Sequence, residues 1–272
     1  MKTCIVLTPK KSRFSPLLFA GKMEQGIKKA SELGYDGVEL NIRDSAEVDQ
    51  DHILEMLDSH GLKLVSFGTG QAYYEDKISL ANADPKIREK TVDRLKDHIV
   101  FASKADAQVV LGSIRGTFSK NPKIKTIEYK GAVDAVKTCA DFAKDYGVTL
   151  TVEPINSRDT SFINTMQEGF DFLKQIDRDN VKLLADTYQM EFDEKSITDA
   201  LKKAGNLLVH VHLVDSDRQV PGCGDIDFES VLKTLKEIKY NGYLSAEVLP
   251  KPDDETAAEK FIGNVKKMLK TI

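Results

Sequence analysis

The sequence predicts a single (β/α)8 (TIM) barrel, an α/β fold that takes in all 272 residues as one domain. Three observations support this prediction. Short apolar runs alternate with longer amphipathic stretches, eight such pairs occur, and glycines often separate a helix from the next strand. Strands that alternate with helices form parallel sheets. Eight such units in a chain of ~250 residues have the size of a closed barrel.

The elements follow one another in a regular order. The predicted strands lie at 4–8, 37–41, 62–67, 107–112, 148–153, 181–186, 207–213 and 243–248. The predicted helices lie near 22–33, 46–59, 86–104, 125–146, 165–176, 194–204, 228–238 and 254–270. The stretches 68–85 and 113–124 are predicted to be irregular loops at the active-site face, because long loops are often functional.

Glycines mark several of the predicted joints. Gly34, Gly61, Gly147, Gly205 and Gly242 each follow a helical stretch, where a left-handed residue often ends a helix. A doubly wound open sheet is the alternative fold. That fold usually has a glycine-rich phosphate loop after its first strand, whereas this chain has LTPKKSRF there. The closed barrel is therefore favoured.

Composition and charge narrow the possible functions. The net charge of −4 and pI near 5.8 give no electrostatic sign of a nucleic-acid partner. No window approaches the ~18 apolar residues of a membrane helix. The N-terminus lacks the apolar region and cleavage site of a signal peptide. The three cysteines, Cys4, Cys139 and Cys223, suggest free thiols. We expect a cytoplasmic protein.

Four residues that can bind a metal lie at the ends of the last four predicted strands: Glu153, Asp186, His212 and Glu247. The active site of a (β/α)8 barrel forms at these strand ends. Three carboxylates at one barrel mouth would repel one another and raise one another's pKa values. A cation between them removes that cost. The pattern therefore predicts a metal site, and its oxygen-rich ligands suit Mn²⁺ or Mg²⁺.

Polar residues also occupy positions below these ligands. Side chains two residues apart on a strand share a face, which places Thr151, His210 and Ser245 one layer below the ligands and Lys182 deeper still. This layer is predicted to orient the ligands. For His210, a core histidine with satisfied hydrogen bonds is the alternative interpretation.

Three segments carry a resemblance to a known family: VEPIN (152–156), LLADTYQM (183–190) and HVHLVDSDRQVPGCGDIDF (210–228). They resemble the xylose isomerase-like TIM barrel superfamily of sugar phosphate isomerases and epimerases. The closest likeness is to the ketose 3-epimerases, the D-tagatose and D-psicose 3-epimerase group. The segment GYDGVELN (34–41) is also typical of the superfamily. The resemblance implies a homo-oligomer, either a dimer or a tetramer.

The resemblance also implies roles for single residues. The four strand-end residues would bind Mn²⁺ or a similar cation such as Mg²⁺, Co²⁺ or Zn²⁺. Glu153 and Glu247 would act as acid and base on opposite faces of the substrate, and Arg218 would contact ketose oxygens. Gln189 and Asp159 stand where the family has His and Glu at the carbonyl end of the sugar. These two differences argue for another small polyol, ketose or sugar phosphate as substrate.

The resulting hypothesis is an isomerase of carbohydrate metabolism. The metal would stabilise an enediolate when one of Glu153 and Glu247 removes a proton next to a carbonyl. Arg218 would hold a sugar or phosphate oxygen, or else pair with Asp215 or Asp217. The segment PGCGD (221–225) is either a flap or a tight turn.

Other functions stay open at this point. A lyase or dehydratase of a cyclic keto acid or keto-inositol would use the same site. An apurinic-site endonuclease shares the barrel but needs a histidine-rich three-zinc cluster, and this chain has five histidines in all. A sugar-binding protein without catalysis would not need four ligands. The expected partner is a small sugar or sugar phosphate, with no nucleic acid and no membrane.

Overall fold

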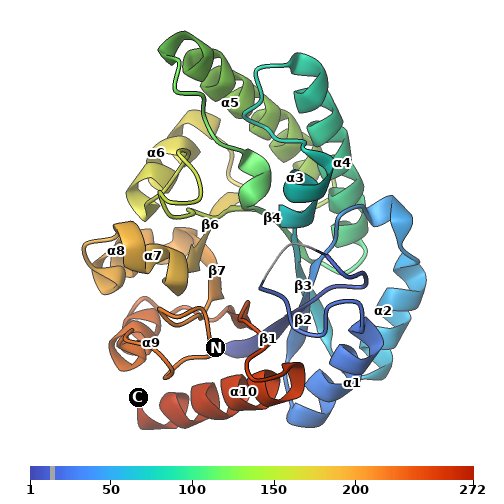
Figure 1. Ribbon diagram of the computed structural model, residues 1–272, viewed down its shortest axis with the longest axis vertical. Coiled ribbons are helices and arrows are strands. Elements are labelled where there is room, and N and C mark those ends of the chain that lie inside the picture. The colour runs from blue at the N-terminus through green and yellow to red at the C-terminus, as the bar shows by residue number, and fades with distance from the viewer. Residues whose placement is uncertain (13–15) are drawn as a thin grey trace.

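The computed structural model describes residues 1–12 and 16–272, and it confirms the closed barrel (Figure 1). Eight parallel strands follow one another in sequence order, and β1 pairs with β8 to close the barrel. The predicted segment LTPKKSRF extends into residues that lie outside this description. The strands are β1 (Lys2–Leu7), β2 (Gly37–Asn41), β3 (Lys63–Gly68), β4 (Gln108–Leu111), β5 (Leu150–Val152), β6 (Val181–Asp186), β7 (Leu208–His212) and β8 (Tyr243–Ala246).

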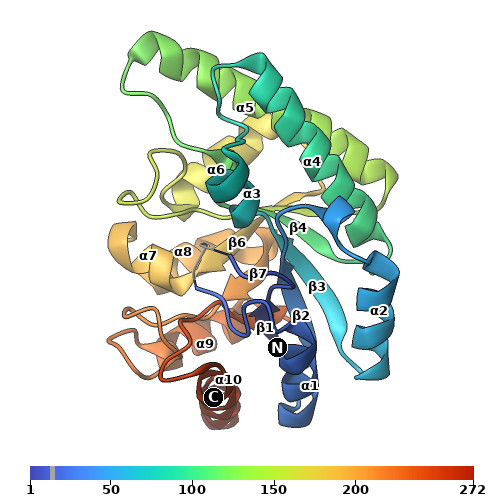
Figure 2. The same cartoon turned by 45° about the vertical axis from the view of Figure 1, so that its right-hand side comes forward.

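Helices surround the barrel, as Figures 1 and 2 show. One long or medium helix follows each strand before the next strand begins. These are α1 (Met23–Leu33), α2 (Gln50–Ser59), α4 (Pro85–Ser103), α5 (Pro122–Asp145), α6 (Met166–Ile176), α8 (Ile197–Ala204), α9 (Phe228–Glu237) and α10 (Asp254–Thr271). Short 3-10 helices add η1 (Ser45–Glu47), η2 (Ser113–Arg115) and η3 (Gly205–Leu207).

Local signals in the sequence explain where these helices begin. Asp84 and Asn121 accept hydrogen bonds from the first backbone N–H groups of α4 and α5, and a proline follows each of them. Thr165 caps α6 by accepting from the backbone N–H of Glu168 (3.2 Å). Such caps satisfy N–H groups that have no partner inside the helix. A proline in the first turn loses no helical hydrogen bond.

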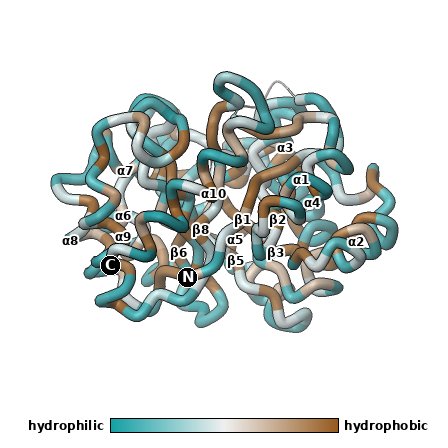
Figure 3. Tube along the Cα trace, turned by 90° about the horizontal axis from the view of Figure 1, so that it is seen from below, coloured by the Kyte–Doolittle hydropathy of each residue, from teal (hydrophilic) through white to brown (hydrophobic). Residues whose placement is uncertain are grey.

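The hydrophobic core fills the space between the strands and the surrounding helices. Figure 3 shows hydrophobic segments on the strands and hydrophilic ones on the outer connections. Every residue of β2 is buried, and β1 is buried from its second residue onward. Strands of a parallel barrel are expected to be covered on both faces. Among the described residues, no helix combines the length and apolar character needed to cross a bilayer.

Two short helices at the strand ends were not predicted. The stretch 68–85, expected to be irregular, contains α3 (Gly70–Asp76), and α7 (Thr187–Asp193) follows β6 without a break. The stretch 113–124 likewise contains η2 and the start of α5. Helices of seven residues show too few turns for a hydrophobic period to be recognised. Both α3 and α7 follow the C-terminal ends of strands, which places them at the barrel mouth.

The glycine joints are partly as predicted. Gly34 is the left-handed C-cap of α1, with φ of 75°. Gly242 is not a helix cap: α9 ends at Glu237, its C-cap is Ile238, and the positive φ falls on Lys239. Gly242 instead lies close to the Tyr240 hydroxyl, only 2.5 Å from where a Cβ would stand. A close approach, rather than a cap, therefore explains this glycine.

Candidate functional site

The four predicted metal ligands converge at the ends of β5 to β8. Asp186 and His212 are the last residues of β6 and β7, and Glu153 and Glu247 directly follow β5 and β8. His212 Nδ1 lies 3.5 Å from Asp186 Oδ2. It also lies 3.7 Å from Glu153 Oε1 and 3.7 Å from Glu247 Oε2. All four side chains are buried. The order of strands in the barrel thus produces one compact cluster.

The geometry of this cluster fits a divalent cation. His212 Nδ1 and Asp186 Oδ2 are buried and have no hydrogen-bond partner among the described residues. Buried polar atoms are nearly always paired, so these two indicate a missing positive partner. Two ligands of one ion at ~2.1 Å can lie up to ~4.2 Å apart. The distances from His212 Nδ1 to the three carboxylates, 3.5 to 3.7 Å, lie inside that limit.

Asp186 has a second role at the start of α7. Its Oδ1 accepts hydrogen bonds from the backbone N–H groups of Tyr188 (2.9 Å) and Gln189 (3.2 Å). These bonds fix the carboxylate and leave Oδ2 directed toward His212 Nδ1. The cap at the end of β6 therefore positions the ligand, and it explains why α7 begins without a loop.

Glu39 is a central residue that the sequence interpretation missed. It lies in the middle of β2 and is almost fully buried. Its Oε2 accepts hydrogen bonds from His210 Nε2 (2.8 Å), His212 Nε2 (3.2 Å) and the Ser66 hydroxyl (2.8 Å). The Ser245 hydroxyl is also within reach, at 3.4 Å. A glutamate inside an otherwise apolar parallel strand was the signal that could have identified it.

The hydrogen bond to Glu39 fixes the tautomer of His212. A carboxylate only accepts, so Nε2 carries the proton and Nδ1 presents its lone pair to the cluster. Histidines that bind metals commonly donate their other N–H to a carboxylate in this way. His210 joins the same carboxylate and stacks edge to face with His212, with ring centroids 5.3 Å apart. His210 is therefore part of the network below the ligands.

Burial and neighbouring charges shift the pKa values at the site. Burial raises the pKa of both Glu153 and Glu247, and the neighbouring carboxylates act in the same direction. The charge of His212 opposes this rise most strongly, but burial outweighs it. Burial alone would raise the pKa of Glu39 as well, but His212 and His210 outweigh it and hold that pKa well below its usual range. Glu39 therefore stays ionised while the two mouth glutamates hold protons more readily.

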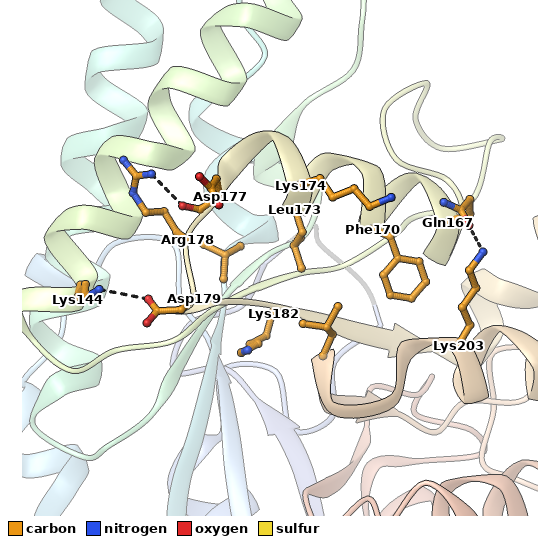
Figure 4. A pocket seen from close by; sticks show the side chains of 12 residues that line it. Lys144, Gln167, Phe170, Leu173, Lys174, Asp177, Arg178, Asp179, Lys182 and Lys203 are labelled. Atoms are coloured by element: carbon orange, nitrogen blue, oxygen red, sulfur yellow. Dashed lines mark hydrogen bonds and ion pairs between the residues drawn. The ribbon is translucent and has the colours of Figure 1, made fainter.

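Lys182 lies outside this network. Figure 4 shows it at the start of β6, among residues that line a cavity of about 750 Å³ together with Phe170 of α6 and Lys203 of α8. Lys182 is four residue steps from Asp186 along the strand, a distance of ~13 Å. Its side chain is only partly buried, and it forms no hydrogen bond with a described residue of the ligand cluster. The polar layer below the ligands therefore ends before Lys182.

Arg218 reaches the cluster from the loop after β7. Its Nη2 lies 3.8 Å from Glu247 Oε2, and its guanidinium lies over the ring of Tyr188, 4.8 Å from the centroid. The alternative interpretation of Arg218, an ion pair with Asp215 or Asp217, is not what the structure shows. Asp215 instead accepts hydrogen bonds from four backbone N–H groups, those of Ser216, Gly222, Cys223 and Ile226. A buried carboxylate thus holds PGCGD as a compact turn around Arg218.

Gln189 and Asp159 are joined through a residue not predicted, Asn156. The amide nitrogen of Asn156 donates to Gln189 Oε1 and to Asp159 Oδ2 (3.0 Å), and its backbone N–H also donates to Gln189 (3.1 Å). Asn156 and Gln189 are buried, whereas Asp159 is exposed. The network positions the Gln189 amide beside the segment that carries Glu153.

Arg115 supports the same segment from the other side and was also missed. It is 1% exposed, and its guanidinium donates to the carbonyls of Leu111 (2.9 Å), Phe162 and Glu153. Burial lowers its pKa to about 10. Its positive charge is therefore used to fix the backbone at Glu153 rather than to bind a carboxylate. Loop contacts of this kind leave no pattern in a single sequence.

Comparisons with known proteins agree with this geometry. Residues 27–268 match the xylose isomerase-like TIM barrel family. The chain is 31% identical to a D-psicose 3-epimerase of Ruminiclostridium cellulolyticum, over 79% of this chain and 74% of that protein. It is 29% identical to an L-ribulose 3-epimerase of Methylomonas sp., over 84% of this chain and 79% of that protein. A D-allulose 3-epimerase from Methylomonas sp., crystallised with D-allulose, superposes with a TM-score of 0.82 at 25% identity, covering 98% and 97% of the two chains.

Proposed function

Because the chain belongs to the xylose isomerase-like TIM barrel family, we propose that it is a divalent-metal-dependent sugar epimerase or isomerase that acts on a ketose or a related small polyol. One observation carries the proposal: two buried carboxylates, Glu153 and Glu247, flank the same imidazole nitrogen at equal distances of 3.7 Å. Relatives similar over most of the chain are sugar epimerases, which supports the same class of reaction.

Glu153, Asp186, His212 and Glu247 would hold the ion, with Mn²⁺ as the first candidate. Three carboxylates and one imidazole form a ligand set that suits Mn²⁺ or Mg²⁺ better than soft, thiol-binding metals. A bound cation of this kind would act as a Lewis acid toward the oxygens of a carbonyl and a neighbouring hydroxyl. Glu39 would keep the His212 lone pair directed at the ion through its hydrogen bond to Nε2.

The two glutamates would move the proton. One would remove hydrogen from the carbon next to the carbonyl, and one would return a proton to the enediolate. Return from the opposite face would give epimerisation, and return to the adjacent carbon would give isomerisation. Arg218, Gln189 and Asp159 would hold substrate oxygens.

The test is hydrogen exchange. The manganese-loaded protein is incubated with a panel of ketoses in D₂O, and deuterium at carbon is followed by mass and NMR. We expect deuterium in substrate and product, and a loss of ~10²–10⁴-fold in Glu247→Gln, because that change removes a proton-transfer group. Glu194→Gln is the matched control, since Glu194 is partly buried and accepts a hydrogen bond from Met166 outside the cluster. Sugar turnover that shows neither deuterium exchange with solvent nor internal transfer of hydrogen would exclude the enediolate.

A further inference from the structure

The cavity at the ligand cluster opens toward the end of β4. Its wall includes Glu153 and Glu247, and also Gly112 and Ser113. Gly112 lies so close to Glu153 that a Cβ there would be 2.3 Å from Oε2. Gly112 and Ser113 also line a second cavity, between α3 and the loop after β5. These two cavities are small, about 20 and 10 Å³, and the glycine leaves this space free beside a carboxylate that we place in the reaction.

Tyr73 and Tyr74 of α3 also border this space. They line the second cavity together with Asp159 and Thr160, and they line a third cavity of about 430 Å³ as well. Their rings contact each other edge to face, with centroids 5.0 Å apart. The third cavity lies between the loops that follow β3 and β4. Shared wall residues therefore make the three cavities neighbours in a row, in which two small cavities lie between the ligand cluster and the third, larger one.

The walls of this row are tied together. The Thr160 hydroxyl donates to the Gly116 carbonyl (2.9 Å), which joins the loops after β5 and β4. The backbone N–H of Leu80 donates to the Ile114 carbonyl (2.9 Å), which joins the loops after β3 and β4. A preformed cavity of this volume, with aromatic rings and a few polar groups, has the character of a small-molecule site.

The charges along the row indicate which ligand it fits. Asp159 and Glu128 are carboxylates in the walls, and neither forms an ion pair with a described residue. Lys77 is the one exposed cation among the lining residues of the second and third cavities that the structure describes. The guanidinium of Arg115 is directed to three backbone carbonyls. A phosphate needs several cationic or N–H donors, so this row favours an uncharged, hydroxyl-rich group.

We propose that the row of cavities is an extended substrate site, and that the substrate is an uncharged ketose joined to a second sugar-like unit that lies beside Tyr73 and Tyr74. The reacting ketose would lie at Glu153 and Glu247, and the second unit would occupy the third cavity. Tyrosine offers an apolar ring and a hydroxyl, which match the apolar face and the hydroxyls of a sugar. This inference rests on the proposed function for the position of the reacting end.

The test compares ketoses that share a fructose unit. D-fructose, D-fructose 6-phosphate, isomaltulose and lactulose are assayed with the manganese-loaded protein, both for kcat/KM in D₂O exchange and for affinity by calorimetry. At least one disaccharide is expected to exceed D-fructose by ~10-fold or more, the gain typical of a filled pocket. The kcat/KM and affinity of D-fructose 6-phosphate are expected not to exceed those of D-fructose. The inference would be overturned if neither disaccharide exceeds D-fructose in kcat/KM or affinity, or if the phosphate ester has the highest values of all.

A pair of variants locates the effect. Ala83 is exposed and lines the third cavity, so Ala83→Trp fills that space. Ala46→Trp adds the same indole to an exposed alanine of η1, outside the row. The preference for the disaccharide over D-fructose should fall ~10-fold in Ala83→Trp and persist in Ala46→Trp. A preference that survives in both variants contradicts the site. If no ketose takes up deuterium, the proposed function fails. The calorimetric affinities alone then decide whether the extended site binds the disaccharide more tightly than D-fructose.

Discussion

Replacing Glu39 by Gln tests whether the carboxylate below the cluster sets metal affinity. Gln keeps the shape and one acceptor oxygen but removes the charge from the bonds to His210 and His212. The new amide nitrogen would take the place of Oε1, which has no partner. A charged acceptor is worth ~1 kcal/mol more than a neutral one, and the bond to His212, the proposed ligand, is the one that bears directly on the metal. Changing a partner of a metal-binding histidine typically lowers metal affinity ~10–100-fold, and we expect ~30-fold here.

The assay is calorimetric titration of the metal-free protein with Mn²⁺, with circular dichroism to verify that the variant is folded. Glu194→Gln again serves as the control, because it also removes a partly buried carboxylate that accepts one hydrogen bond. We expect the Mn²⁺ dissociation constant to rise ~30-fold for Glu39→Gln and to stay unchanged for the control. A folded Glu39→Gln protein with wild-type affinity would refute the role given to this carboxylate.

Two further predictions follow from the pKa shifts. Because the pKa values of Glu153 and Glu247 are raised in the metal-free protein, mainly by burial, Mn²⁺ must displace protons, and its affinity should increase as the pH rises above the ordinary glutamate value of ~4.3. Titration heats in two buffers of different ionisation enthalpy should then differ, and equal heats would count against the prediction. Burial raises the pKa of the Cys139 thiol to about 12 and that of Cys4 well above its usual value, whereas Cys223 is exposed. A disulfide reagent should therefore label one thiol rapidly in the native protein, and Cys223→Ser should abolish that phase; rapid labelling of Cys4 or Cys139 would show the burial to be wrong.

The sequence was sufficient for the barrel and for the four converging ligands, because both depend on order along the chain. A residue at the end of each of four consecutive parallel strands must reach one mouth, so Glu153 and His212 could be brought together without coordinates. Glu39 could not be assigned in this way. It lies within a strand rather than at its end, and the barrel must close before β2 can be seen to face β7.

The loops were beyond the reach of the sequence for a different reason. Asn156 and Arg115 act through backbone carbonyls and amide groups, whose positions depend on irregular segments. No periodicity or spacing records such contacts. Lys182 shows the opposite error: alternation along β6 suggested a place below the ligands, but its side chain is partly buried and lines a cavity with residues of α6 and α8.

The bond between Glu39 and His212 joins residues 173 positions apart in the chain. During synthesis, most of the protein must still be made after β2 before the imidazole of His212 exists. The barrel can close only after β8 has also been made, because β8 pairs with β1. Tight binding of the proposed ion would therefore be the last event of maturation. A nascent or truncated chain would then hold that cation poorly, and the bound cation would distinguish finished molecules from incomplete ones.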